Sequence, residues 1–139
     1  MNDATSIRPA HLSDFEGLWR VERVITPASG PAARFSGTAL WAPENDTLRY
    51  REDGQLHMAG QPAMKAEREY IWTRDLDVLF PDGRFFHTVP LDGTKTQHWC
   101  DPDTYSGRYN FDRWPVFHVT WAVKGPNKDY TSQTEYRRC

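Results

Sequence analysis

A two-residue alternation of apolar and polar side chains is the feature that most constrains how this chain can fold. From residue 17 onward it replaces almost all helical spacing, and turn-forming residues interrupt it at intervals of roughly 8–12 residues. Antiparallel strands that bury one face produce this pattern, whereas a helix would place apolar residues three or four positions apart. The sequence therefore predicts an all-β fold, a single antiparallel up-and-down barrel of about nine or ten strands.

The chain has the length of one domain. With 139 residues it is large enough for a single core and too short for two ordinary ones. Residues 1–12 carry no periodic pattern and predict a flexible arm, and residues 13–139 predict the one barrel domain. Ser13 and Glu16 form a capping box that Gly17 ends, which indicates a short N-terminal helical turn before the first strand.

Charge and composition exclude several classes of partner. The 17 basic and 19 acidic residues are interspersed and give a net charge of -2, so no nucleic-acid partner is expected. No apolar run approaches the ~18 residues of a membrane span, and the amino terminus lacks the apolar core of a signal peptide. We therefore expect a cytoplasmic protein with no membrane partner and with Cys100 and Cys139 as free thiols. A homodimer stays open.

Aromatic residues dominate the apolar content of the chain. Six Trp, six Tyr and seven Phe make up 14% of the residues, although the mean hydropathy is only -0.77. Large rings in a chain short of aliphatic bulk predict an interior lined by aromatic and polar groups rather than a dry leucine core.

The clearest strand pair is the carboxyl-terminal hairpin. The segment GPNK at 125–128 forms a loop that pairs Lys124 with Asp129. The apolar side chains before the loop must face the interior, so the side chains opposite them face it too. The inward set is Phe117, Val119, Trp121 and Val123 before the loop, and Tyr130, Ser132, Thr134 and Tyr136 after it.

A second hairpin holds the polar stretch QHWCDPDTYSGRYNF. With the segment DPDT as its loop, Cys100 pairs with Tyr105 and His98 pairs with Gly107. His98 and Cys100 then face the interior, and Gly107 leaves room beside the imidazole. A slip of one residue would turn both side chains outward.

The stretch LFPDGRFFH predicts a third hairpin. Pro81 suits the second position of a type I turn, and Gly83 suits the left-handed residue of the bulge that follows. In this register His87 lies opposite Asp77. The sequence assigns no role to His87.

Arg68 is the one charge that the alternation places on the inner face of residues 64–72. A buried guanidinium needs an anion or several hydrogen-bond acceptors. No inward carboxylate emerges from the strand pattern, because Glu67, Glu69 and Glu135 all fall on outer faces. Two interpretations stay open: Arg68 binds an acidic ligand, or it lies at the barrel mouth and reaches water.

The polar hairpin has three possible roles: a zinc site, a cysteine nucleophile or part of a cavity wall. Zinc prefers ligands of the kind offered by His98, Cys100 and the two aspartates beside Pro102, but those aspartates are explained as turn formers. A Cys100 nucleophile activated by His98 would need an oxyanion donor, and none can be named. We interpret His98 and Cys100 as part of a half-polar cavity wall. We expect no metal and assign no catalytic residue.

Short motifs give the chain a resemblance to known proteins. The segment GLW at 17–19, after the helical turn, resembles the Gly-x-Trp signature of the lipocalins and the wider calycin superfamily. The segment DY at 129–130 is similar to the second motif of that superfamily, although it lies nearer the chain end than in true lipocalins. The basic residue that packs over the tryptophan has two counterparts, Arg137 and Arg138. Strand parity favours Arg138, in cation–π contact with Trp19.

A wider resemblance covers residues 13–138. The segments GLWRVERVI, FSGTALW, LFPDGRFFH and VKGPNKDY look like an uncharacterised family of small bacterial proteins placed among the calycins. That family has no assigned activity. The resemblance therefore implies a calycin-like, lipocalin-like barrel and no particular reaction.

A small barrel holds one ligand at its centre. We predict binding of a small organic ligand that is acidic and partly apolar or aromatic, with no cofactor. Arg68 would recognise a carboxylate or phosphate, and the rings would hold the apolar body. The predicted ligand-binding residues are Trp41, Arg68, Tyr70, Trp72, His98, Cys100, Tyr105, Tyr109, Trp121, Tyr130 and Ser132.

Other functions stay open. The calycin resemblance includes decarboxylases of phenolic acids, which use tyrosine, arginine and a carboxylate, and haem-binding members, which use one histidine. Arg68 with Tyr105 or Tyr109 matches the first pattern except for the carboxylate, and His98 matches the second. A structural barrel with a filled interior and no ligand is a third alternative.

Overall fold

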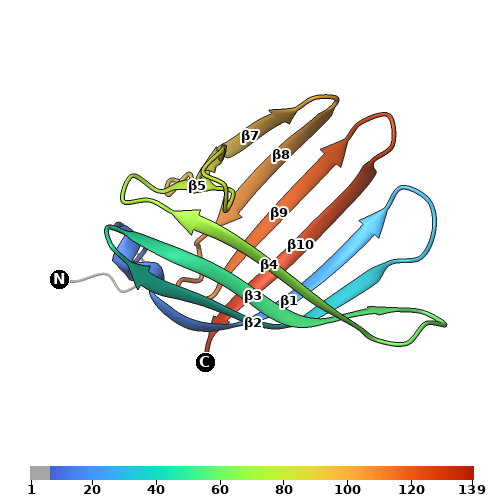
Figure 1. The fold of residues 1–139 in the computed structure, drawn as a ribbon, viewed down its shortest axis with the longest axis horizontal. Helices are drawn as coiled ribbons and strands as arrows, with labels where there is room; N and C mark the ends of the chain where they lie inside the picture. The colour runs from blue at the N-terminus through green and yellow to red at the C-terminus, as the bar shows by residue number, and fades with distance from the viewer. Residues whose placement is uncertain (1–6) are drawn as a thin grey trace.

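The computed structural model describes residues 7–139, in which ten strands form one antiparallel sheet (Figure 1). Within residues 7–139, one 3-10 turn, η2 (Leu12–Phe15), precedes the strands, and no helix of this part of the chain is long and apolar enough to cross a membrane. The strands are β1 (Gly17–Pro27), β2 (Ala33–Glu44), β3 (Thr47–Met58), β4 (Met64–Trp72), β5 (Asp77–Leu79), β6 (Phe85–Thr88), β7 (Lys95–Cys100), β8 (Asp103–Asn110), β9 (Phe117–Lys124) and β10 (Asp129–Arg138).

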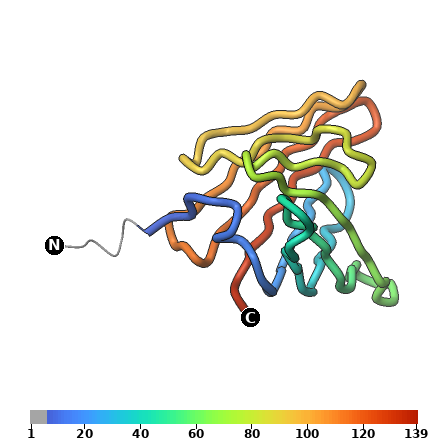
Figure 2. Tube along the Cα trace, turned by 60° about the vertical axis from the view of Figure 1, so that its left-hand side comes forward, coloured from blue at the N-terminus to red at the C-terminus, as the bar shows by residue number. Residues whose placement is uncertain are grey.

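The sheet curls into a nearly closed barrel. Its strand order is β6-β5-β4-β3-β2-β1-β10-β9-β8-β7, so every neighbour is joined by a backbone ladder except the two ends, β6 and β7. Figures 1 and 2 both show the segment of β5 and β6 beside β7, and β6 contacts β7 without pairing in the described part of the chain. The predicted all-β, up-and-down barrel with a short helical turn is confirmed.

The carboxyl-terminal hairpin has the predicted register. Lys124 pairs with Asp129, and the pairing continues to Phe117 opposite Tyr136. Val119, Val123, Ser132 and Thr134 are all buried, as inward-facing positions require. Because β10 also pairs with β1, this hairpin places a row of hydroxyl groups inside the barrel next to the first strand.

The polar hairpin has the predicted face but not the predicted register. Cys100 pairs with Asp103 and His98 pairs with Tyr105, and only Asp101 and Pro102, joined by a cis peptide bond, lie between the strands. The predicted four-residue loop was wrong because Asp103 is a strand residue: its side chain is buried and lies 3.4 Å from the ammonium of Lys128. A shift of two residues keeps His98 and Cys100 on the inner face.

Gly107 makes room for a different ring from the one expected. A Cβ at this position would lie 2.7 Å from atoms of the Trp121 ring. Gly107 pairs with Trp121 across β8 and β9, and with Thr96 rather than His98 across β7 and β8. The missing side chain therefore lets the indole lie flat against β8.

The third hairpin also departs from its predicted register. His87 pairs with Val78 rather than Asp77, and Phe86 is an extra residue in β6 between the two paired positions. This bulge turns Phe86 inward next to His87, so that both side chains are buried.

The helical turn begins two residues earlier than the capping box predicts. Its N-cap is His11, and the carboxylate of Asp14 accepts hydrogen bonds from the backbone N–H groups of Ala10 and His11. The carboxylate of Asp14 thus takes the role expected of the Glu16 side chain. The first six residues of the predicted arm lie outside the described residues.

Phe15 fixes this turn across one end of the barrel. Its ring contacts five others, those of Trp41, Trp72, Phe111, Trp114 and Phe117. We call this aromatic cluster, together with Trp19, the floor. Its members other than Trp114 are nearly or completely buried.

Trp19 packs against Arg138 as predicted. The indole is completely buried, and the guanidinium carbon of Arg138 lies 4.2 Å from its ring centroid. The indole N–H donates to the carbonyl of Phe15, and Arg138 donates to the carbonyls of Asp14 and Glu16. These bonds tie the first and last strands to the helical turn.

Candidate functional site

A cavity of about 320 Å³ lies inside the barrel above the floor. All six tyrosines of the chain line it, and every strand except β2 contributes a side chain to the lining. Ten of the eleven residues expected at the site lie on this lining: Arg68, Tyr70, Trp72, His98, Cys100, Tyr105, Tyr109, Trp121, Tyr130 and Ser132.

Trp41 is the expected residue that does not line the cavity. It is 1% exposed and its ring packs against Trp19 and Tyr50, with a centroid distance of 4.6 Å to Tyr50. Alternation placed Trp41 on the inner face correctly. Its position along the strand, next to Phe15, puts it in the floor instead.

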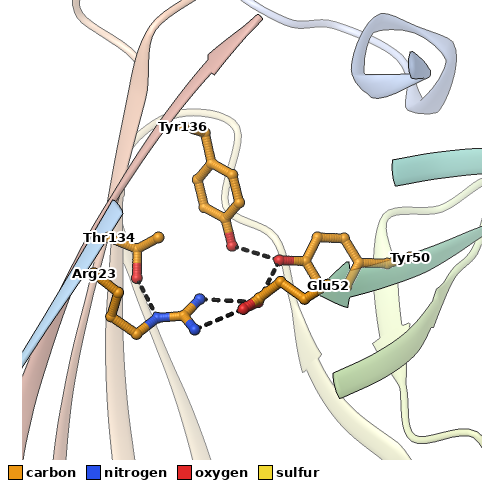
Figure 3. Close-up of polar contacts among 5 residues, drawn as sticks. All are labelled: Arg23, Tyr50, Glu52, Thr134 and Tyr136. Atoms are coloured by element: carbon orange, nitrogen blue, oxygen red, sulfur yellow. Dashed lines mark hydrogen bonds and ion pairs between the residues drawn. The ribbon is translucent and has the colours of Figure 1, made fainter. Parts of the chain in front are cut away.

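A buried ion pair crosses the interior between β1 and β3. Arg23 and Glu52 are 6% and 1% exposed, and the guanidinium donates to both carboxylate oxygens at 2.7 and 3.0 Å (Figure 3). The two strands are not neighbours, because β2 lies between them. The curvature of the sheet therefore brings the two charges together.

Three hydroxyl groups complete this polar cluster (Figure 3). Arg23 Nε donates to Thr134 Oγ1 at 2.7 Å, and the hydroxyl of Tyr50 donates to Glu52 at 2.6 Å. Because that bond uses the only hydroxyl hydrogen of Tyr50, the 2.9 Å contact with Tyr136 must have Tyr136 as its donor. The hydrogen bonds thus run in one direction, from Tyr136 through Tyr50 to Glu52.

The protonation states of the cluster follow from these contacts. Burial alone would raise the pKa of Glu52, but the hydrogen bonds and positive charge of Arg23 outweigh it and hold that pKa below its ordinary value. Burial and the nearby carboxylate raise the pKa of Tyr136 to about 12. At neutral pH the cluster therefore consists of one ion pair and neutral phenols.

The sequence analysis missed this cluster. The expectation that no carboxylate faces inward was wrong, because Glu52 is buried inside the barrel, and Arg23 is a second inward arginine beside Arg68. The sequence pattern did indicate both positions. In β1, Arg23 continues the inward alternation of Trp19 and Val21. In β3, Glu52 continues that of Leu48 and Tyr50.

Arg68 lines the cavity but is exposed, so the penalty for a buried unpaired charge does not apply to it. It pairs with Glu52 in the ladder between β4 and β3, and its charge acts on Glu52 and on the hydroxyl of Tyr130. No carboxylate among residues 7–139 lies within 4.0 Å of its guanidinium. Arg68 and Cys100, the exposed lining residues, mark the mouth of the cavity.

Aromatic rings form the wall of the cavity at the seam between β6 and β7. Phe80 and Phe86 stack with centroids 5.0 Å apart, and Phe86 stacks on Trp121 at 5.2 Å, with interplanar angles of 14° and 21°. The ring of His98 meets Phe86 edge-on at 5.2 Å. These contacts join β6 to β7 and β9 at the seam where the backbone ladder is absent.

His87 is held neutral behind this wall. Its side chain is 3% exposed, and burial, with the charge of His98, lowers its pKa to about 3. Nε2 lies 2.8 Å from the hydroxyl of Tyr109, whose pKa burial raises, so a neutral phenol and a neutral imidazole share one hydrogen bond whose direction depends on the imidazole tautomer. Nδ1 has no hydrogen-bond partner in the described structure.

The mouth carries further polar groups. Lys128 donates to the hydroxyl of Tyr105 at 3.2 Å and pairs with Asp103. His98 is half-buried and Cys100 is exposed, so the two share the inner face of β7 at different depths. Among residues 7–139, no three His, Cys, Asp or Glu side chains converge to hold a metal ion.

Comparison with known proteins identifies the fold and the family. A solved structure described as an S-type phycobiliprotein lyase, CPES, from Guillardia theta is similar, with a TM-score of 0.58 and 12% sequence identity. The match covers 92% of this chain and 90% of that one, so the two share the lipocalin-like barrel fold. No curated protein sequence matches the chain significantly. Residues 15–138 match one family model, and the chain therefore belongs to the family of unknown function DUF6314.

Proposed function

We propose that this barrel binds a small organic acid in its cavity. The observation that carries the proposal is the unpaired charge of Arg68 on a lining that is otherwise neutral or internally paired. Arg23 is neutralised by Glu52, and His87 is uncharged at neutral pH. A bound carboxylate or phosphate would compensate the remaining positive charge and accept hydrogen bonds from the guanidinium.

The shape of the cavity supports a compact, partly aromatic ligand. Its volume of about 320 Å³ is at the lower end of the ~300–1,000 Å³ of small-molecule sites. The stacked rings of Phe80, Phe86 and Trp121 offer a flat apolar surface beside the mouth. An aromatic or unsaturated body would stack there while its acid group contacts Arg68.

Titration of small acids against two arginine variants tests the proposal. A panel of fatty, phenolic and phosphorylated acids would be added to the wild-type protein while tryptophan fluorescence is followed, because Trp72 and Trp121 line the cavity. Arg68→Met should weaken binding about tenfold, ~1.4 kcal/mol, since an exposed charge contributes less than a desolvated one. Arg108→Met, which removes an exposed arginine from the outer face of β8, should leave binding unchanged.

Two results would contradict the proposal. Wild-type protein that binds none of the acids would leave the cavity without its proposed ligand class. Equal affinity in wild-type and Arg68→Met protein would show that Arg68 does not contact the acid group. Native mass spectrometry of freshly purified protein would add a direct measurement of any retained ligand mass.

A second candidate function is acid–base chemistry on the bound acid. Glu52 favours it, because this inward carboxylate contacts both Tyr50 and Arg23 and so supplies the group missing from the decarboxylase pattern. Its lowered pKa and fully used oxygens weigh against a role as general acid at neutral pH. Incubation with phenolic acids, followed by mass spectrometry of the products, would detect loss of carbon dioxide. The cytoplasmic location and the homodimer stay predictions.

A further inference from the structure

The side chain of Ser132 is mostly buried, and its hydroxyl faces the cavity without a hydrogen-bond partner among residues 7–139. Ser132 is 8% exposed, lies on the inner face of β10 and lines the cavity. No hydrogen bond of its side chain forms within residues 7–139. A hydroxyl group that faces the cavity and that no other side chain engages is available to donate to, and accept from, a bound molecule.

The next two inward residues of β10 have hydrogen-bonding capacity left over as well. Thr134 accepts a hydrogen bond from Arg23, so its own hydroxyl hydrogen stays available as a donor. Tyr136 gives its hydrogen to Tyr50, so its oxygen stays available as an acceptor. Ser132, Thr134 and Tyr136 therefore present both donors and acceptors along one wall.

This wall suits a neutral group and not a second acid. Both oxygens of Glu52 accept hydrogen bonds from Arg23, so the charge of Arg23 is already compensated by this carboxylate. An anion at Thr134 would therefore lie close to a carboxylate and gain no free cation. A hydroxyl group both donates and accepts, which matches what the wall has available.

We infer that Ser132, supported by Thr134, forms a subsite for a hydroxyl group of the ligand, so that the barrel selects hydroxy acids over plain acids. The inference rests on the proposed function, since it extends the same bound acid from Arg68 at the mouth to the wall of β10. The acid group and the hydroxyl would lie at opposite ends of one compact molecule.

Matched pairs of acids that differ only in one terminal hydroxyl test the subsite. Suitable pairs are hydrocinnamate with its para-hydroxy derivative and hexanoate with its omega-hydroxy derivative. Wild-type protein should bind at least one hydroxy acid about tenfold more tightly than its partner, as expected for one well-placed hydrogen bond. Ser132→Ala should remove this preference and leave the affinity for the plain acid unchanged.

Two further variants keep the test decisive. Ser132→Thr retains the hydroxyl and should retain the preference, and Thr131→Ala removes an outward hydroxyl from the same strand and should change nothing. Thermal melting should show Ser132→Ala at least as stable as wild type, because the lost hydroxyl has no partner in the free protein. An unchanged plain-acid affinity also shows that the variant is folded.

The outcomes separate the two proposals. Equal affinity of wild-type protein for both members of every pair overturns the subsite and leaves acid binding intact. A preference that persists in Ser132→Ala overturns the assignment to Ser132. Failure to bind any of the four acids removes the proposed function, and the subsite with it.

Discussion

The floor and the cavity are built from the same inner face and the same kind of residues, yet one is filled and the other is open. In the floor, Phe15 enters from η2 and fills the space between Trp41, Trp72 and Phe117 with ring centroids 5.1–6.2 Å apart. At the other end no segment of the described chain enters the barrel, and tyrosines are the most frequent residues of the lining. Whether an inner face becomes core or cavity therefore depends on what plugs it.

The two regions also differ in their polar atoms. In the floor, only the indole N–H of Trp41 is buried without a partner among the described residues, whereas Trp19 donates to a backbone carbonyl. Around the cavity, an ion pair and several phenols face one another across the interior. Removing a ring should therefore cost the most stability in the floor, whereas removing a charge or adding a proton should cost the most stability around the cavity.

Trp19→Ala should cause the largest loss of stability, because it removes a completely buried ring from the floor. We expect the free energy of unfolding to fall by about 4–5 kcal/mol, the upper part of the range for a large aromatic residue. The lost cation–π contact with Arg138 adds to this effect. Urea unfolding would measure it, and a loss below about 1 kcal/mol would mean that the floor is not the main core.

Glu52→Gln should have the next largest effect, because it leaves Arg23 charged and buried without a counter-ion. We expect a loss of about 3–4 kcal/mol in the free energy of unfolding. Replacing both partners, with Arg23→Met and Glu52→Leu together, should recover much of it, since a hydrophobic pair avoids desolvated charge. A double variant no more stable than Glu52→Gln would contradict this account of the ion pair.

The pH dependence of stability should reveal His87. Its folded-state pKa of about 3 lies below the ordinary value of 6.5, so the unfolded chain binds a proton more readily than the folded one. Stability is then fully present above pH ~6.5 and falls as the pH drops toward 3. We expect a loss of about 2 kcal/mol between pH ~8 and pH ~5 from this one group.

His87→Gln supplies the comparison for that measurement. Glutamine does not titrate, so the decline in stability between pH ~8 and pH ~5 should become shallower by about the contribution assigned to His87. An identical pH profile in the two proteins would show that the histidine accepts a proton without loss of the fold. Restricting the range to above pH ~5 separates this effect from the carboxyl groups, which titrate lower.

The sequence predicts faces better than it predicts registers. The carboxyl-terminal hairpin came out correctly, because only one alignment brings Phe117 and its apolar neighbours onto the inner face while keeping GPNK in the loop. In the polar hairpin, His98 lies on the predicted face although its partner is Tyr105. A period of two is unchanged by a shift of two, so alternation alone cannot separate these registers.

The parts of the site that escaped prediction depend on distances across the barrel. Arg23 and Glu52 each follow a legible alternation, but their contact joins strands that are not neighbours. Phe86 faces inward because of a bulge, which an alternating pattern does not encode. Trp41 and Ser132 share the inner face, and only the entry of Phe15 decides that one lies in the floor and the other beside the cavity.

Gly107→Ala should have the smallest effect and should act only on the cavity. The added methyl group would lie 2.7–2.9 Å from three atoms of the Trp121 ring, so the indole must move toward the cavity. Trp121 is only half-buried and has open space beside it, so we expect a loss of about 1 kcal/mol rather than the larger cost of overpacking a filled core. Tryptophan fluorescence should shift, and any bound acid should be held more weakly, because the displaced ring narrows its site.

Trp121→Phe replaces the indole by a smaller ring, so Gly107→Ala should cost less stability in that background, and a double-mutant cycle would measure the coupling. Additive effects of Gly107→Ala and Trp121→Phe would mean that Gly107 does not position the indole. In the Trp19→Ala background, Gly107→Ala should cost the same stability as in the wild type, which would confirm that the floor and the cavity respond independently.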